Sequence, residues 1–190
     1  VDITINDAVE TVTATADGTN TNCVADVQGL TGTATTFNGA TAEGTWTVSA
    51  NATGTLADGG VGDATATYTP ADTDAGLTLT FTYTSEDLGG CGTMQETVDI
   101  TINDAVETVT ATADGTNTNC VDDVQGLTGT ATTFNGMTAE GTWTVSANAT
   151  GTLADGGVGD ATATYTPADT DAGQTLTFTY TSDDFGGCGT

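Results

Sequence analysis

The chain contains no lysine, arginine or histidine, although it carries 26 aspartate and glutamate residues, and its formal net charge is −26. Without basic side chains it can form no side-chain salt bridge, no arginine clamp for phosphate and no Schiff-base lysine. Without histidine it lacks the usual general base near neutral pH and the commonest metal ligand. Nucleic acid is excluded as a direct partner, because no side chain can neutralise its phosphates. We expect the carboxylates to form a solvated surface that keeps the chain in solution.

Long apolar runs and catalytic pairs are also missing. No stretch reaches the roughly 18 apolar residues of a membrane-spanning helix, and no segment has the periodicity of an amphipathic helix. No serine or cysteine has a base beside it that would activate it as a nucleophile. Carboxylate pairs such as Asp72 and Asp74 lie in predicted turns, where acidic side chains usually face solvent. We therefore expect no membrane insertion and no enzymatic activity.

What the chain does have is a tandem repeat, in which residues 1–93 recur as residues 98–190 with five substitutions. Near-identical copies at a fixed period are typical of arrays of small domains. Each copy is long enough for one modest hydrophobic core. The substituted pairs are Ala25/Asp122, Ala40/Met137, Leu77/Gln174, Glu86/Asp183 and Leu88/Phe185. We predict two interchangeable modules.

Apolar and polar residues alternate along most of each copy, which is the period of a half-buried β-strand. In residues 77–84, leucine, phenylalanine and tyrosine alternate with threonine. Glycine and Asx turns separate this run from others; those others lie at residues 9–16, 27–36, 53–57 and 63–69. About seven strands per module and essentially no helix predict an all-β fold, made of two tandem immunoglobulin-like antiparallel sandwiches.

The same alternation predicts which side chains face the interior. In the first module the expected core consists of Leu30, Trp46, Val48, Leu79, Phe81, Tyr83, Val98, Ile100 and Ile102. The five substitutions avoid the centre of this set, which agrees with the assignment.

Each module has two cysteines at matching positions, Cys23 and Cys91 in the first and Cys120 and Cys188 in the second. Matched cysteines in a small β-rich domain favour disulfides in an oxidising compartment over buried free thiols. We expect the pairs Cys23–Cys91 and Cys120–Cys188, each closing a loop that contributes about 4 kcal/mol. The alternative is a Cys91–Cys120 bond, with Cys23 and Cys188 reaching neighbouring chains.

Several short motifs follow one another in a fixed order after the first cysteine. They are Leu-Thr-Gly-Thr-Ala at residues 30–34, Gly-Thr-Trp at 44–46, Ala-Thr-Tyr-Thr-Pro at 66–70 and a closing Val-Asp-Ile-Thr-Ile-Asn at 98–103. In this order they resemble the immunoglobulin-like repeats of large bacterial surface proteins, adhesins and extracellular fibres. The resemblance covers both modules. It implies an extracellular, load-carrying protein, at the cell surface or in a secreted fibre, without a catalytic motif.

Calcium is the one cofactor for which the sequence offers candidate ligands; otherwise we expect none. Asp72 and Asp74, with their counterparts Asp169 and Asp171, supply carboxylate oxygens of the kind that calcium prefers. No segment matches a twelve-residue calcium loop. Two formal glycosylation sequons begin at Asn51 and Asn148, both in predicted turns.

The phase of the repeat divides the chain unevenly. The first module, residues 7–103, includes Val98–Asn103 as its closing strand, whereas the second module, residues 104–190, has no equivalent after it. A sandwich without that strand keeps an open groove and unpaired edge groups. Residues 1–6 have the matching sequence, so we expect this hexapeptide to complete the second module of a neighbouring chain. The residues expected to enter the two grooves are Val1, Ile3, Ile5, Val98, Ile100 and Ile102.

Donation of this kind is head-to-tail and does not close, so it predicts an open filament of identical chains. A window taken from one longer polypeptide would have the same repeat pattern, and we keep both readings. We predict a structural repeat unit of an extracellular bacterial fibre or adhesin stalk whose adhesive target is unknown. The alternative is a binding module for a glycan, a receptor or ice on a cell-surface protein; the near-identity of the two copies favours interchangeable spacers.

Overall fold

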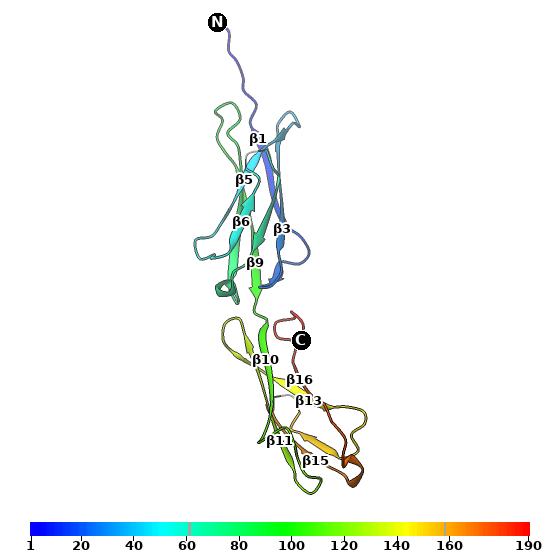
Figure 1. Cartoon of the computed structure of the whole chain (residues 1–190). Helices are drawn as coiled ribbons and strands as arrows, with labels where there is room; N and C mark the ends of the chain where they lie inside the picture. Colours follow the sequence, from blue (N-terminus) through cyan, green and yellow to red (C-terminus); the bar gives the residue numbers. More distant parts are fainter. Residues whose placement is uncertain (61, 158) are drawn as a thin grey trace. The chain divides into compact units, whose positions relative to one another are not determined.

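The chain forms two compact units, Val1–Asn103 and Asp104–Thr190, in the computed structural model, which describes residues 1–60, 62–157 and 159–190. Both units consist of β-strands (Figure 1). Among the described residues the only helical segments are two short 3₁₀ turns, η1 (Asp72–Asp74) and η2 (Asp169–Asp171). The predicted all-β fold is therefore confirmed. No helix in the described ranges is long and apolar enough to cross a membrane.

The first sheet of unit 1 has the strand order β1-β3-β7-β6. The short β4 pairs with the C-terminal part of β3, whereas β7 pairs with its N-terminal part. Every pairing in this sheet is antiparallel. Its strands are β1 (Val9–Ala16), β3 (Gln28–Thr36), β4 (Thr41–Ala42), β6 (Thr55–Asp58) and β7 (Thr65–Thr69). The alternating runs predicted at residues 9–16 and 27–36 correspond closely to β1 and β3.

The second sheet of unit 1 has the order β2-β9-β8-β5. Its strands are β2 (Thr21–Cys23), β5 (Gly44–Val48), β8 (Thr78–Ser85) and β9 (Gln95–Asn103). The β5–β8 and β8–β9 pairs are antiparallel, whereas β2 runs parallel to β9. In this sheet β9 lies between β8 and β2, and it hydrogen-bonds to both.

The core of unit 1 lies between these two sheets. Leu79 and Phe81 of β8 are 0% exposed, and their partners on β9 are Ile100 and Val98 respectively. The aromatic rings pack in pairs, with the centroids of Trp46 and Tyr83 5.2 Å apart. Each fully buried aliphatic or aromatic side chain contributes about 1.5–3 kcal/mol of transfer free energy. Nearly all the predicted core is confirmed as buried; Val48 alone is only half-buried.

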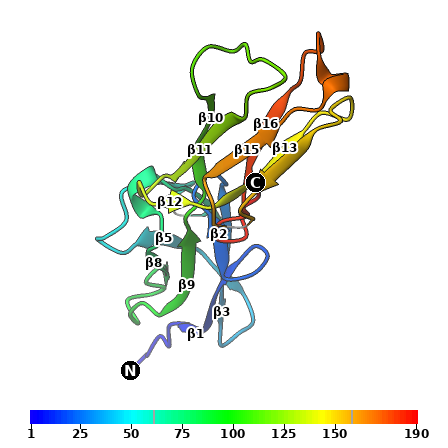
Figure 2. The same cartoon turned by 90° about the horizontal axis from the view of Figure 1, so that it is seen from below.

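Unit 2 repeats the first sheet but only part of the second. The order β10-β11-β15-β14, with β12 paired to β11, matches the first sheet of unit 1. Its strands are β10 (Val106–Ala113), β11 (Gln125–Thr133), β12 (Thr138–Ala139), β14 (Thr152–Asp155) and β15 (Thr162–Thr166). The second sheet consists of two strands, β13 (Gly141–Val145) and β16 (Phe178–Ser182), which lie side by side (Figure 2).

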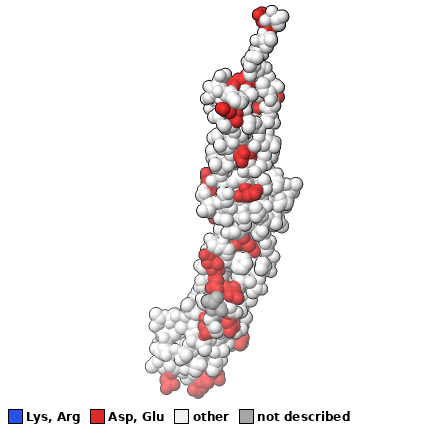
Figure 3. Space-filling view, turned by 180° about the vertical axis from the view of Figure 1, so that it is seen from behind, with Lys and Arg blue, Asp and Glu red and all other residues white. Residues whose placement is uncertain are grey.

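Carboxylates are dispersed over the surface. Figure 3 shows aspartate and glutamate side chains in several groups across the viewed face, with no basic residue beside them. Many of the uncharged side chains are threonines on the outer faces of strands, and several form hydrogen bonds across neighbouring strands. In unit 1 the hydroxyl oxygens of Thr13 and Thr33 are 2.6 Å apart, and those of Thr110 and Thr130 in unit 2 are also 2.6 Å apart. These cross-strand pairs stabilise the outer face of each first sheet.

Candidate functional site

The candidate site is the place in unit 2 that corresponds to β9 of unit 1. In unit 1, β9 contributes Val98, Ile100 and Ile102 to the core, with 8%, 0% and 0% of their surfaces exposed. These side chains cover one edge of the sandwich. Among the described residues of unit 2, no strand pairs with the corresponding edge of β16.

Several side chains that β9 covers in unit 1 have counterparts in unit 2 that are more exposed. Leu79 and Phe81 are fully buried, whereas Leu176 and Phe178 are only half-buried. Ala75 is 4% exposed in unit 1, whereas its counterpart in unit 2, Ala172, is exposed. The strand itself is also shorter, because β8 spans Thr78–Ser85 and β16 only Phe178–Ser182. The missing neighbour thus removes both packing and backbone pairing.

The result is a groove of about 920 Å³ within unit 2. Apolar and aromatic side chains form much of its wall, among them Leu127, Trp143, Tyr165, Leu176 and Phe178. Residues 117–121 also line the groove. The equivalent residues in unit 1 form β2, and all three residues of β2 pair with β9. In unit 2 residues 118–120 form no strand. Within the described part of unit 2, neither the other side of β16 nor residues 118–120 pair with a strand.

Residues 1–6 have the opposite character, being a strand-like sequence without a sheet. Val1, Ile3 and Ile5 are 121%, 78% and 86% exposed, the highest values among the large apolar side chains that the structure describes. In Figure 1 the segment extends away from the strands of unit 1. One anchor holds its end, because the Asn6 side-chain nitrogen donates a hydrogen bond to the Gly89 carbonyl oxygen at 2.6 Å. The chain thus presents an exposed apolar hexapeptide and, in another unit, an apolar groove.

Apart from the groove, a cluster of polar groups surrounds Asp74 in the η1 turn of unit 1. Asp74 is 0% exposed, yet both of its carboxylate oxygens accept hydrogen bonds from the protein. Oδ1 accepts from the backbone nitrogen and the hydroxyl of Thr53, both at 2.8 Å. Oδ2 accepts from the Tyr68 hydroxyl at 2.5 Å and from the backbone nitrogens of Gly54 at 3.0 Å and Ala71 at 2.9 Å. Asp74 therefore ties three segments of unit 1 together.

These contacts shift the ionisation of both partners. Burial raises the pKa of Asp74, but the hydrogen bonds from Tyr68, Ala71 and Thr53 outweigh it, so that the pKa lies below its usual value. Burial, and then the hydrogen bond to Asp74, raise the pKa of the Tyr68 hydroxyl well above its usual value. In unit 2, hydrogen bonds from Thr150, Tyr165 and Ala168 lower the pKa of Asp171 in the same way. Each carboxylate is therefore charged at neutral pH.

The geometry does not favour the calcium role predicted for Asp72 and Asp74 and for Asp169 and Asp171. A calcium ion needs carboxylate oxygens that are free to face it, but the oxygens of Asp74 already accept five protein hydrogen bonds. Asp72 and Asp169 are exposed. In the ranges that the structure describes, no group of three or more acidic or cysteine side chains is placed to hold a metal ion. The buried aspartates are structural instead.

The predicted disulfides within each module are not formed. Cys91 and Cys120 are free thiols, and both are exposed, so neither Cys23–Cys91 nor Cys120–Cys188 is formed. The alternative Cys91–Cys120 bond is absent for the same reason. Cys23 and Cys188 are each disulfide-bonded.

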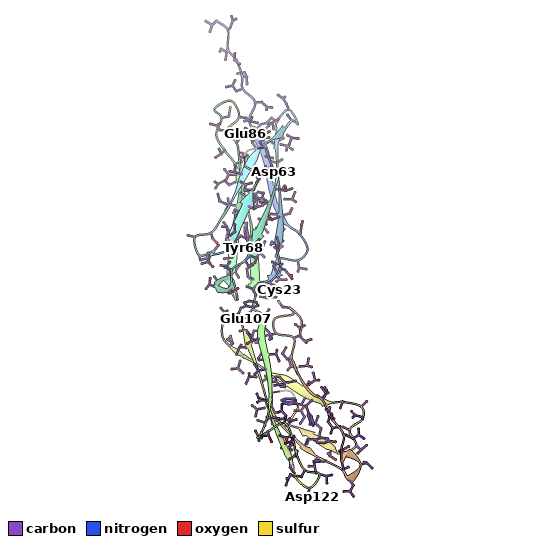
Figure 4. All side chains as sticks on the ribbon, viewed as in Figure 1. Cys23, Asp63, Tyr68, Glu86, Glu107 and Asp122 are labelled. Atoms are coloured by element: carbon purple, nitrogen blue, oxygen red, sulfur yellow. The ribbon has the colours of Figure 1, made fainter. Side chains whose placement is uncertain are left out.

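The two cysteines of unit 1 lie at opposite ends of the sandwich, which is why they do not pair. Cys23 ends β2 beside the last residues of β9, at the end of β8 that begins with Thr78. Cys91 follows the other end of β8, in the loop after Ser85. Eight residues of strand separate these ends by roughly 23 Å, whereas the Cα atoms of a disulfide lie within about 7 Å. Figure 4 shows Cys23 at one end of unit 1 and Glu86, which opens the Cys91 loop, at the other.

The two glycosylation candidates are accessible. Asn51 and Asn148 are both exposed and lie in the turns that follow β5 and β13. In unit 2 the side chain of Asn148 donates to the Thr175 carbonyl oxygen at 3.2 Å. Both remain predicted acceptor sites.

Comparison with known proteins gives one distant structural likeness. No protein-family model matches the chain, and no curated protein matches it. A solved structure described as surface layer protein SbsC, domains 4–9, aligns with 93% of the chain at 17% sequence identity and a TM-score of 0.34. The chain spans 31% of the length of that structure.

Proposed function

We propose that the chain is a structural subunit of an extracellular filament, in which residues 1–6 of one copy fill the groove in unit 2 of the next copy. The observation that carries this proposal is that residues 1–6 and residues 98–103 have the same sequence. The sequence Val-Asp-Ile-Thr-Ile-Asn occurs once as an exposed segment, at residues 1–6, and once as the last six residues of β9, where it fills the equivalent place in unit 1.

The strand register of unit 1 supports a specific mode of binding. Because Val98 pairs with Phe81 and Ile100 pairs with Leu79, the donated segment would run antiparallel to β16, with Val1 opposite Phe178 and Ile3 opposite Leu176. Its other edge would pair with residues 118–120, as β9 pairs with β2. Addition of a strand in this way supplies main-chain hydrogen bonds along both edges and side-chain contacts on one face.

Apolar burial is the main favourable contribution to donation. Burial of Val1, Ile3 and Ile5 contributes roughly 1.5–3 kcal/mol for each side chain, before the costs of association and of ordering the segment. Donor and acceptor lie on different units of one chain, so each added copy presents a new donor and a new groove. Such a heterologous contact builds an open assembly rather than a closed ring.

One substitution between the repeats lies in the groove. Leu77 in unit 1 is replaced by Gln174 in unit 2, where the side chain lines the groove and is exposed. In unit 1 the Leu77 carbonyl oxygen accepts a hydrogen bond from the Ile102 backbone nitrogen at 2.8 Å. The backbone of Gln174 can accept the same bond from Ile5, while its polar side chain reduces the apolar surface of an empty groove.

The immunoglobulin-like class and the extracellular location have their own support. The orders β1-β3-β7-β6 and β9-β8-β5 correspond to strands A-B-E-D and G-F-C of a constant-type immunoglobulin sandwich. Disulfide-bonded cysteines are typical of proteins outside the cytosol. We assign the chain a passive mechanical role, without enzymatic activity.

A competing peptide tests the proposal. Under reducing conditions, the purified chain should assemble, and an excess of the synthetic peptide Val-Asp-Ile-Thr-Ile-Asn should shorten the assemblies in sedimentation velocity because it occupies the groove. The control peptide has aspartate in place of its first isoleucine, and it should have no effect. Equal effects of the two peptides, a chain that stays monomeric without peptide, or material far above 18.8 kDa on a reducing denaturing gel would each contradict strand exchange.

A further inference from the structure

We infer that each strand donation is sealed by a disulfide between Cys91 of the donor copy and Cys120 of the acceptor copy. This inference rests on the proposed function, because only donation brings these two residues together. It assigns a covalent cross-link site to the two cysteines that carry free thiols.

The acceptor side is defined by the pairing of β2 with β9. In unit 1 Cys23 pairs with Asn103, and the next backbone nitrogen, that of Val24, donates to the Asn103 carbonyl oxygen at 3.1 Å. The repeat makes Cys120 the counterpart of Cys23 and Asn6 the counterpart of Asn103. Donation in the same register therefore places Cys120 of the acceptor beside Asn6 of the donor, at the strand spacing of about 4.8 Å.

The donor side is defined by the contact between Asn6 and the loop that carries Cys91. Besides the 2.6 Å hydrogen bond from Asn6 to the Gly89 carbonyl, a Cβ atom at Gly89 would lie only 2.8 Å from the Asn6 Cβ atom. Gly89 and Gly90 have positive φ angles of 65° and 74°, and the turn closes with a 3.2 Å bond from the Cys91 nitrogen to the Leu88 oxygen. Cys91 is thus held two residues from the atom that Asn6 contacts.

Donation would therefore bring Cys120 of the acceptor and the Cys91 turn of the donor to the same residue, Asn6. A disulfide requires Cα atoms about 4.4–6.8 Å apart. Both thiols are exposed before donation, so each is accessible to an oxidant and to the other.

The repeat supplies an independent observation in favour of this pairing. Cys23 occupies the same place in its repeat as Cys120, and Cys188 the same place as Cys91. Cys23 and Cys188 are disulfide-bonded, whereas Cys91 and Cys120 are not. Donation would bring together, from two copies, Cys120 and Cys91. These are the repeat equivalents of Cys23 and Cys188, which are the cysteines that are disulfide-bonded.

The bond is formed by thiol–disulfide exchange with a small-molecule disulfide of the surroundings. One protein thiolate attacks a sulfur atom of that reagent, which gives a mixed disulfide and releases one small thiol. The second protein thiolate then attacks the protein sulfur of the mixed disulfide, which forms the Cys91–Cys120 bond and releases the second small thiol. Two electrons pass from the protein to the reagent, and the two protons of the cysteines end on the released thiols.

Two single variants with complementary defects test the inference. Wild-type chain, Cys91→Ser and Cys120→Ser are assembled in oxidised glutathione and run on a non-reducing denaturing gel. The wild type should give a ladder of multiples of 18.8 kDa, and each variant alone should lose every band above the monomer. An equal mixture of the variants should give only one new band, at about twice the chain mass, because one donor Cys91 and one acceptor Cys120 meet and neither free end can extend.

The other readouts separate this inference from strand donation itself. If both variants form filaments in electron micrographs but the mixture gives no dimer band, donation stands and the disulfide is refuted. If the wild type forms no filaments, donation fails. A ladder that persists in an Ile3→Asp variant, whose donor segment cannot fill the groove, would mean that the thiols react on random encounter and would also overturn the inference.

Discussion

Replacement of Ile3 by aspartate is expected to raise the concentration needed for half-maximal assembly at least 100-fold. The counterpart Ile100 is 0% exposed opposite Leu79 in unit 1, so Ile3→Asp removes roughly 1.5–3 kcal/mol of apolar burial and places a carboxylate in an apolar groove, which costs more. Each 1.4 kcal/mol changes the association constant tenfold. Sedimentation velocity over a range of concentrations measures the effect.

The matched control is Thr4→Asp, which adds the same charge to the same segment. The counterpart Thr101 is half-buried on the outer face of β9, where its hydroxyl lies 3.1 Å from that of Thr78. This control should change the assembly concentration by less than about tenfold, because only a partly solvated hydrogen bond is affected. Equal losses for Ile3→Asp and Thr4→Asp would show that charge, and not insertion of the apolar side chain, controls assembly.

Replacement of Asp74 by alanine is expected to destabilise unit 1 by about 4 kcal/mol. The change leaves the Tyr68 hydroxyl and the backbone nitrogens of Thr53 and Ala71 without their acceptor. The Gly54 nitrogen loses one of its two acceptors and keeps its 2.9 Å bond to the Tyr68 hydroxyl oxygen. Each buried donor left unpaired costs roughly 1–3 kcal/mol, although the costs do not add fully. Denaturant unfolding can be followed in a Trp143→Phe background, in which Trp46 is the remaining tryptophan. Tyr68→Phe, which removes one donor, is expected to cost less than half as much.

The pH dependence of this difference has a definite sign. The folded-state pKa of Asp74 is lowered from its ordinary value of 3.8, so its stabilising contribution is complete above about pH 5 and is lost as the pH falls through the folded pKa. The gap in unfolding free energy between the wild type and Asp74→Ala should therefore narrow between pH 5 and pH 2. A gap that is constant or that widens over this range would contradict the assigned hydrogen bonds.

The strands could be predicted from the sequence because the buried positions repeat with a period of two. Threonine alternates with large apolar residues in residues 77–84, and Leu79, Phe81 and Tyr83 are all nearly inaccessible to solvent. Residues 98–103 show the same pattern, and their apolar side chains are buried in β9. Where one face of a strand is packed and the other is solvated, the alternation of apolar and polar residues predicts which way each side chain faces.

The cysteine pairs and the role of Asp74 could not be predicted in this way. Which cysteines meet depends on which end of the sandwich each loop occupies, and the sequence distance between Cys23 and Cys91 carries no such information. Asp72 and Asp74 look alike in the sequence as a pair of turn carboxylates. They differ only because the η1 turn directs Asp74 inward, toward the hydroxyl of Tyr68, while Asp72 stays exposed.

A cryo-electron microscopy map of the assembled filament, at a resolution that shows side chains, tests the central claim most directly. We expect an added strand between β16 and residues 118–120, antiparallel to β16, with Ile3 opposite Leu176 and Val1 opposite Phe178. A groove that stays empty in the filament, or one that is filled by a different segment or in a register shifted by one residue, would contradict the account.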